Sequence, residues 1–132
     1  MASDGFPQEI NDFLIKHIHS VEQLEILLLL HRDTGRSWTA IEIAQELRGD
    51  RQSVENRLQD LCAQRMLACT SSNDEHHYYF NESDTELNRK VAGLSHIYAE
   101  RRMSVINLIF SKPIDNIRVF ADAFRLRKDK PE

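Results

Sequence analysis

The fold is decided by residues 37–80, which read SWTAIEIAQELRGDRQSVENRLQDLCAQRMLACTSSNDEHHYYF. Thr39 can cap a helix here, because its hydroxyl can accept from a free backbone N–H while the Glu42 side chain reaches back. Apolar residues then recur at the spacing of one helical face. They are Ile41, Ile43, Ala44 and Leu47. Gly49 supplies the positive φ that commonly ends a helix, so the pattern predicts a helix of about ten residues.

Asp50 can cap a second helix at once, since a carboxylate is favoured at the positive end of the helix dipole. The face that this helix would bury consists of Val54, Leu58, Leu61 and Cys62. The opposite face carries mostly long polar groups, namely Arg51, Gln52, Glu55, Asn56 and Gln59. Such groups can form hydrogen bonds with phosphates or with base edges in a major groove. DNA is therefore the first partner to test.

The period of the sequence changes after this second helix. Residues 66–70 and 77–80 are β-prone runs, and they flank the polar segment 71–75. This pattern predicts a hairpin, to which Ser37 and Trp38 can add a short third strand. The expected order is helix, short strand, two helices and a two-stranded hairpin, which is a mainly α fold with a small β-hairpin.

The same stretch resembles the winged helix-turn-helix family of bacterial transcriptional regulators, in the broad sense that includes the MarR-like and PadR-like groups. The matching residues are 38–44, then Val54, Leu58 and Leu61, then Met66, Leu67 and the return strand 78–80. The resemblance covers roughly residues 20–82 and implies a winged helix-turn-helix domain there. It also implies that the helix from Arg51 to Arg65 is the recognition helix and that residues 71–77 are the wing.

The resemblance and the polar face together define the expected contacts with double-stranded DNA. The expected base-reading residues are Arg51, Gln52, Ser53 and Asn56, and the expected residues at the DNA backbone and on the wing are Thr39, Arg48, Arg57, His76 and His77. Wings of this family usually carry Arg or Lys, whereas this one has Asp74 and Glu75, so we expect repulsion from phosphate at its tip. Protonation of the two wing histidines below about pH 6.5 would favour DNA.

The composition suits a single domain with a packed core. The chain has 132 residues, of which 41% are hydrophobic, and this length buries about two-thirds of the unfolded surface. The formal net charge of −4 argues against a protein that coats nucleic acid indiscriminately. Dimeric sequence-specific repressors can nevertheless be acidic overall and basic only at the contact surface.

Residues 1–19 are expected to form an N-terminal helix. Pro7 suits its first turn, and its apolar face is expected to pack against a partner subunit or the C-terminal helices. Ser20 and Gln23 then form a capping-box pattern that opens a broadly apolar helix, which suits the first helix of a winged-helix core.

Residues 83–132 are expected to form a helical dimerisation region. Ser83 and Glu86 give a third capping-box pattern, and a helix to Phe110 carries an apolar seam that only Arg101 interrupts. Pro113 breaks this helix and opens another. The expected interface residues are Leu87, Val91, Leu94, Tyr98, Val105, Leu108, Ile117 and Phe124. The alternative is that the helix folds back onto its own domain.

Catalytic motifs are missing from the sequence, which has neither a Gly-rich phosphate loop nor a recognisable nucleophile motif. We therefore expect no enzyme activity, no cofactor and no metal site. Cys62 and Cys69 are expected to be reduced thiols, with a redox pair as the alternative. The apolar run 24–30 is too short to cross a bilayer, and with no secretory signal visible we expect a cytoplasmic protein.

Three functions fit these features. The first is a dimeric, sequence-specific DNA-binding transcriptional regulator. The second is a winged-helix protein-protein interaction module without DNA binding, which would use the acidic wing and the C-terminal helices. The third adds to the regulator a small-molecule effector in a pocket that Trp38, Tyr79 or Tyr98 could line.

Overall fold

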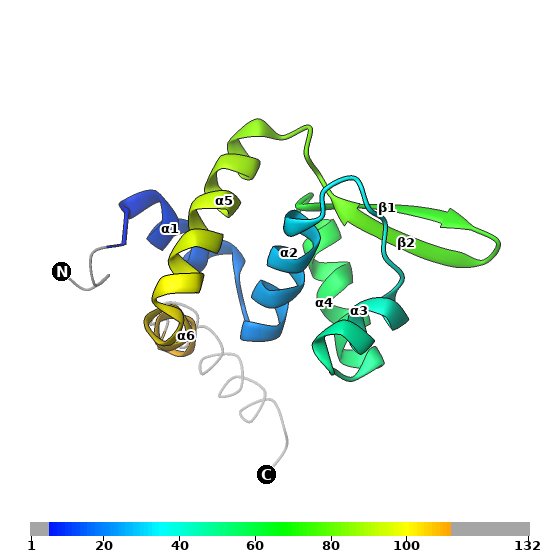
Figure 1. Ribbon diagram of the computed structural model, residues 1–132, viewed down its shortest axis with the longest axis horizontal. Coiled ribbons are helices and arrows are strands. Elements are labelled where there is room, and N and C mark those ends of the chain that lie inside the picture. The colour runs from blue at the N-terminus through cyan, green and yellow to red at the C-terminus, as the bar shows by residue number, and fades with distance from the viewer. Residues whose placement is uncertain (1–5, 112–132) are drawn as a thin grey trace, which may run out of the picture.

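The computed structural model describes residues 6–111, which form six helices and one two-stranded sheet. In chain order the elements are α1 (Gln8–His17), α2 (Val21–Arg32), α3 (Ala40–Leu47), α4 (Arg51–Ala63), β1 (Leu67–Ser72), β2 (Glu75–Phe80), α5 (Thr85–Glu100) and α6 (Arg102–Phe110). Figure 1 shows α1, α5 and α6 together at one end, α2 in the middle, and α3, α4 and the projecting hairpin at the other end. The expected mainly α fold with a small hairpin is confirmed.

The first helix of the predicted pair, α3, begins as expected but ends differently. Thr39 and Glu42 form the capping box, with N–H···O distances of 3.2 and 3.0 Å. The prediction that Gly49 supplies the positive φ is wrong, because Arg48 takes the left-handed conformation with φ 56°. Gly49 serves close packing instead, since a Cβ at this position would lie 3.2 Å from the Glu22 carboxylate.

Helix α3 buries most of the face that the sequence suggested. Ile43 and Ala44 are buried as expected and Leu47 is partly buried against the core, whereas Ile41 is 43% exposed and Ala40 is buried in addition. The second helix, α4, follows the prediction more closely. Asp50 accepts from the Ser53 backbone N–H at 2.9 Å, and the buried residues of α4 are Val54, Leu58 and Leu61.

The hairpin is longer and its turn is tighter than expected. The strands pair from Leu67 opposite Phe80 to Ser72 opposite Glu75. Asn73 and Asp74 form the turn with φ 52° and 63°, as a type I′ turn requires. The predicted short third strand is confirmed as an isolated bridge, in which Trp38 and Tyr78 exchange two backbone hydrogen bonds of 2.8 and 2.7 Å.

The expected uninterrupted C-terminal helix is wrong. Asp84, not Ser83, caps α5 by accepting from the Leu87 backbone N–H at 3.1 Å. The helix ends at Glu100, and α6 starts after Arg101, which has φ −133° and ψ 52°. A continuous helix would bring Arg101 into the apolar seam. The break instead lets its guanidinium lie 5.1 Å from the centre of the Phe6 ring.

This break lets the predicted dimer seam pack within the chain. Leu87, Val91, Leu94 and Val105 are buried, because α5 packs against α1 and α2 while α6 packs against α1. Tyr98 and Leu108 are partly buried, and Ile117 and Phe124 lie outside the described residues. Within residues 6–111, the seam therefore packs against the chain's own domain, as the alternative prediction stated. None of the helices in this range is long and apolar enough to cross a bilayer.

Candidate nucleic-acid interface

Helix α4 presents four distinct sides, as the helical period places residues three and four apart on one side. Val54, Leu58 and Leu61 face the core. The open side consists of Gln52, Asn56 and Gln59, all exposed. We call the side towards α2 the anchored side; it consists of Ser53, Arg57, Asp60 and Gln64. Arg51, Glu55 and Cys62 lie on the fourth side.

The open side and its neighbour Arg51 carry only local hydrogen bonds. Gln52 Nε2 donates to Asn56 Oδ1 at 3.3 Å, and Arg51 Nε donates to Glu55 Oε2 at 3.1 Å. Exposed pairs one helical turn apart are worth only about 0.2–0.5 kcal/mol. Arg51, Gln52 and Asn56 can therefore exchange these partners for groups on another molecule, as a reading role requires.

Ser53 and Arg57 lie elsewhere than the sequence suggested. Both turn towards α2, where the Ser53 hydroxyl donates to Glu22 Oε1 and Arg57 Nε donates to the same oxygen at 3.3 Å. They belong to the anchored side and not to the open side. Sequence reasoning missed Glu22, because nothing in its local pattern shows that its partners lie more than thirty residues further along the chain.

The anchored side continues with a second group of hydrogen bonds at the corner between α1 and α2. Gln23, only 1% exposed, donates to Asp60 Oδ2 and accepts from the His19 backbone N–H. Gln64 Nε2 donates to the His17 carbonyl oxygen at 3.0 Å, and its Oε1 lies 2.7 Å from His17 Nδ1. These bonds fix α4 against the α1–α2 corner along its whole length.

The remaining predicted DNA contacts lie around the ends of α3 and on the hairpin. Thr39 is used as a cap, while Arg48 is exposed at the α3–α4 turn. His76 Nδ1 lies 2.9 Å from Ser71 Oγ and 3.8 Å from Cys69 Sγ. His77 Nε2 lies 3.5 Å from Glu75 Oε1. The two histidines thus have different partners on the wing.

A small groove brings three of these predicted contacts together. It lies between α3, α4 and the hairpin, has a volume of about 90 Å³, and is lined by Thr39, Arg51 and His76 among others. Ile41 also lines this groove. The exposed isoleucine of α3 therefore lies in the groove, whereas the other apolar residues of α3 face the core.

The electrostatic character of this end of the molecule is acidic. Residues 36–77 contain five cations and seven carboxylates, apart from histidine. The cations are Arg36, Arg48, Arg51, Arg57 and Arg65, and the carboxylates are Glu42, Glu46, Asp50, Glu55, Asp60, Asp74 and Glu75. Because phosphate contacts dominate DNA affinity, this balance favours weak non-specific binding.

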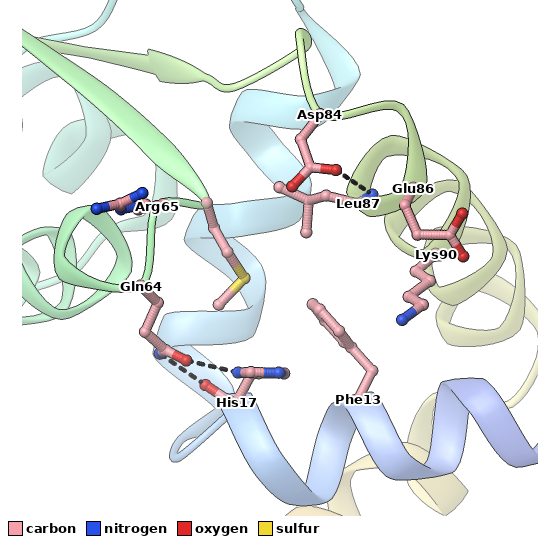
Figure 2. Close-up of a pocket in the computed structure, with 9 residues that line it drawn as sticks. Phe13, His17, Gln64, Arg65, Asp84, Glu86, Leu87 and Lys90 are labelled. Carbon is pink, nitrogen blue, oxygen red and sulfur yellow. Dashed lines mark hydrogen bonds between the residues drawn. The ribbon is translucent and has the colours of Figure 1, made fainter.

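A larger cavity, of about 210 Å³, lies where α1 meets the end of α4 and the start of α5. Figure 2 shows the Phe13 side chain between the helices, with Lys90 on one side and the His17–Gln64 pair on the other. The lining residues are Phe13, His17, Gln64, Arg65, Met66, Asp84, Glu86, Leu87 and Lys90. The expected lining residues Trp38, Tyr79 and Tyr98 are not among them, because Trp38 is a buried core residue on the hairpin side.

Both cysteines are free thiols, but their surroundings differ. Cys69 is exposed, whereas Cys62 is half-buried on α4. Burial, with a smaller contribution from the negative charge of a Cys69 thiolate, raises the pKa of Cys62 to about 11. Within residues 6–111, no three His, Cys, Asp or Glu side chains converge as metal ligands would.

Known structures share this architecture, although no protein-family model and no curated protein sequence matches the chain. The AntR antimony-specific transcriptional repressor is 24% identical, with a TM-score of 0.54 over 69% of this chain and 79% of that one. MepR, a transcription regulator of the Staphylococcus aureus multidrug efflux pump MepA, is 16% identical, with a TM-score of 0.54 over 96% and 90%. A variant of MepR bound to an oligodeoxyribonucleotide matches equally well. The chain therefore has the winged helix-turn-helix fold found in these transcriptional regulators.

Proposed function

We propose that this chain is a dimeric, sequence-specific DNA-binding transcriptional regulator. The observation that carries the proposal is the open side of α4, where amides are exposed on a helix whose position is fixed by its core side and by the adjacent anchored side. The fold adds support, since a protein with the same fold has been crystallised on an oligodeoxyribonucleotide. We also propose a cytoplasmic location for such a regulator.

In this proposal the open side of α4 and the adjacent Arg51 read the bases. Asn56 and Gln52 can pair with adenine through two hydrogen bonds each, and Arg51 can do the same with guanine. Arg48 and Thr39 lie at the turn and the helix start, where phosphate contacts set the register. His76 and His77 are the proposed contacts on the wing.

Dimerisation in this proposal uses apolar surface that remains exposed on α6. Met103 is 63% exposed and Phe110 is 71% exposed, so a second copy can bury both. The region 83–132, together with the N-terminal helix, then joins two winged-helix domains of residues 20–82. A two-fold dimer would place the two copies of α4 about 34 Å apart, one turn of DNA.

The experiment is a selection of genomic fragments by the purified chain at stated salt, followed by variants. Arg51→Ala and Asn56→Ala should each weaken binding to the selected sequence by about 1–3 kcal/mol. Gln8→Ala is the matched control, because Gln8 makes a similar exposed bond to Asp12 (2.9 Å) on α1. Unchanged affinity in both α4 variants would remove this helix from the reading role.

The second candidate function is a protein-protein interaction module without DNA binding. The seven carboxylates between residues 36 and 77 favour it, since an acidic surface repels phosphate and suits a basic protein partner. Failure to enrich any genomic fragment, at low as well as moderate salt, would favour this module over the regulator.

A small-molecule effector is the remaining part of the proposal. The cavity beside α1 and α5 suits it, because Gln64 both lines the cavity and bonds α4 to His17. A ligand that parts this pair would loosen one end of α4. We expect such a ligand to change DNA affinity in the wild type and not in Gln64→Ala, as measured by fluorescence anisotropy.

A further inference from the structure

Glu22 lies where the first turn of α2 meets α4 and the α3–α4 turn. Its Oε1 accepts from the Ser53 hydroxyl and from Arg57 Nε at 3.3 Å. Its Oε2 would lie 3.2 Å from a Cβ placed on Gly49. The side chains of Arg57 and Glu22 are 40% and 27% exposed. The carboxylate, which belongs to α2, therefore contacts α4 and the α3–α4 turn while solvent still reaches it.

The groups around this carboxylate are those that proteins use to hold DNA phosphates. Arginine and serine side chains are common phosphate donors, and both donate here to one oxygen of an anion. Glu22 also lies in the first turn of α2, where the helix dipole favours negative charge. The chain thus supplies its own anion to donors that suit a phosphate.

We infer that Glu22 is an internal stand-in for a DNA phosphate and that it weakens DNA binding by occupying Ser53 and Arg57. This inference rests on the proposed function. A partly exposed ion pair is worth at most about 1 kcal/mol, so a phosphate can displace the carboxylate when DNA binds. The displaced Glu22 then remains close to the phosphate and repels it. Glu22 is thus a positioning residue that sets how much of the Arg57 charge DNA can use.

The test is Glu22→Gln, which keeps the side-chain length and the acceptor oxygen but removes the charge. Affinity for the selected DNA should rise about threefold to tenfold at fixed salt. The plot of log affinity against log salt should steepen by about one, because one more cation meets a phosphate. If this variant does not fold, Glu22→Asp replaces it, since a shorter side chain draws the carboxylate away from Arg57 and should act in the same direction.

Two controls separate this inference from a general effect of charge. Glu25→Gln makes the same change in net charge on the same helix, but its carboxylate accepts from Tyr98 (2.7 Å) and Arg102 (3.1 Å). We expect a smaller gain there and no steeper salt dependence. In an Arg57→Ala background, Glu22→Gln should give a clearly smaller gain and no steeper salt dependence, since the guanidinium that it releases is gone and only the Ser53 hydroxyl and the relieved repulsion remain.

The outcomes distinguish the inference from the proposed function. If the wild type binds the selected DNA but Glu22→Gln binds no tighter, the inference is overturned and the proposed function stands. The same holds if the gain is equally large without Arg57 or appears equally in Glu25→Gln. If neither the wild type nor Glu22→Gln binds any fragment, while both unfold cooperatively on heating, the inference and the proposed function fall together.

Discussion

The two polar sides of α4 differ in the reach of their hydrogen bonds. On the anchored side, Ser53, Asp60 and Gln64 bond to residues 31, 37 and 47 positions away. On the open side, Gln52 bonds only to Asn56, four residues on. Bonds between distant elements determine where the helix lies, whereas local bonds leave its position unaffected. A recognition surface needs both: a backbone that is held in position and side chains that can exchange their partners.

The largest expected effect comes from Gln23, the buried residue behind the anchored side. Gln23→Ala should lower the free energy of unfolding by about 2–4 kcal/mol, because it leaves Asp60 and the His19 N–H without this partner and opens a cavity. Gln59→Ala on the open side should change stability by less than about 0.5 kcal/mol. Urea unfolding measures both, and equal losses would erase the distinction between the two sides.

A smaller loss is expected at the end of α4. Gln64→Ala removes the bonds to His17 and should cost about 1–2 kcal/mol, since both groups are only partly buried. Gln52→Ala is the matched control on the same helix and should leave the melting temperature nearly unchanged while it weakens DNA binding. If Gln52→Ala proved the more destabilising, the local bond would matter more than the long-range one.

Arg48 tests the turn that leads into α4. Arg48→Gly should raise the free energy of unfolding by about 0.5–1 kcal/mol, because glycine adopts the left-handed backbone without a Cβ clash. It should also weaken DNA binding, since one exposed cation is lost. Gln45→Gly within α3 is the control and should cost about 1 kcal/mol. A lower free energy of unfolding in Arg48→Gly would show that the Arg48 side chain makes a stabilising contact that outweighs its backbone strain.

The two thiols test burial on α4 by their reactivity, and their substitution should change stability little. Burial raises the pKa of Cys62 to about 11, so this thiol stays mostly protonated at pH 9, where more than half of an ordinary cysteine, with a pKa of about 8.5, is ionised. The thiolate is the reactive form. At pH 8 we therefore expect one fast-reacting thiol per chain with Ellman's reagent and one that reacts only after denaturation. Cys69→Ser should remove the fast phase, and Cys62→Ser should leave it intact.

Local signals explain why the centre of the sequence could be predicted. The Thr39–Glu42 capping box, the Asp50 cap and the hairpin each depend on residues a few positions apart. Their chemistry is visible in the sequence without knowledge of the fold. The end of α3 was predicted wrongly because either Arg48 or the adjacent Gly49 could adopt the left-handed conformation that ends the helix. The sequence does not show that the Glu22 carboxylate lies beside Gly49.

Long-range packing explains the errors. Ser53 and Arg57 look as polar as Gln52 in the sequence, and only the position of α2 decides that they face Glu22. The apolar seam of α5 was expected to face a partner subunit, and packing against the chain's own helices was the alternative. The break at Arg101 decided between them within residues 6–111, because it brings α6 back against α1.

The tightness of the hairpin turn constrains the charge that the wing can carry. Asn73 and Asp74 both have left-handed backbones, a conformation that glycine, asparagine and aspartate tolerate and that lysine and arginine disfavour. A two-residue tip of this kind therefore favours asparagine, aspartate or glycine, although Arg48 and Arg65 show that this chain also places arginine in that conformation. A lysine or arginine at the tip would cost about 1–2 kcal/mol of backbone strain, so the tightness of the turn and the sign of its charge are linked.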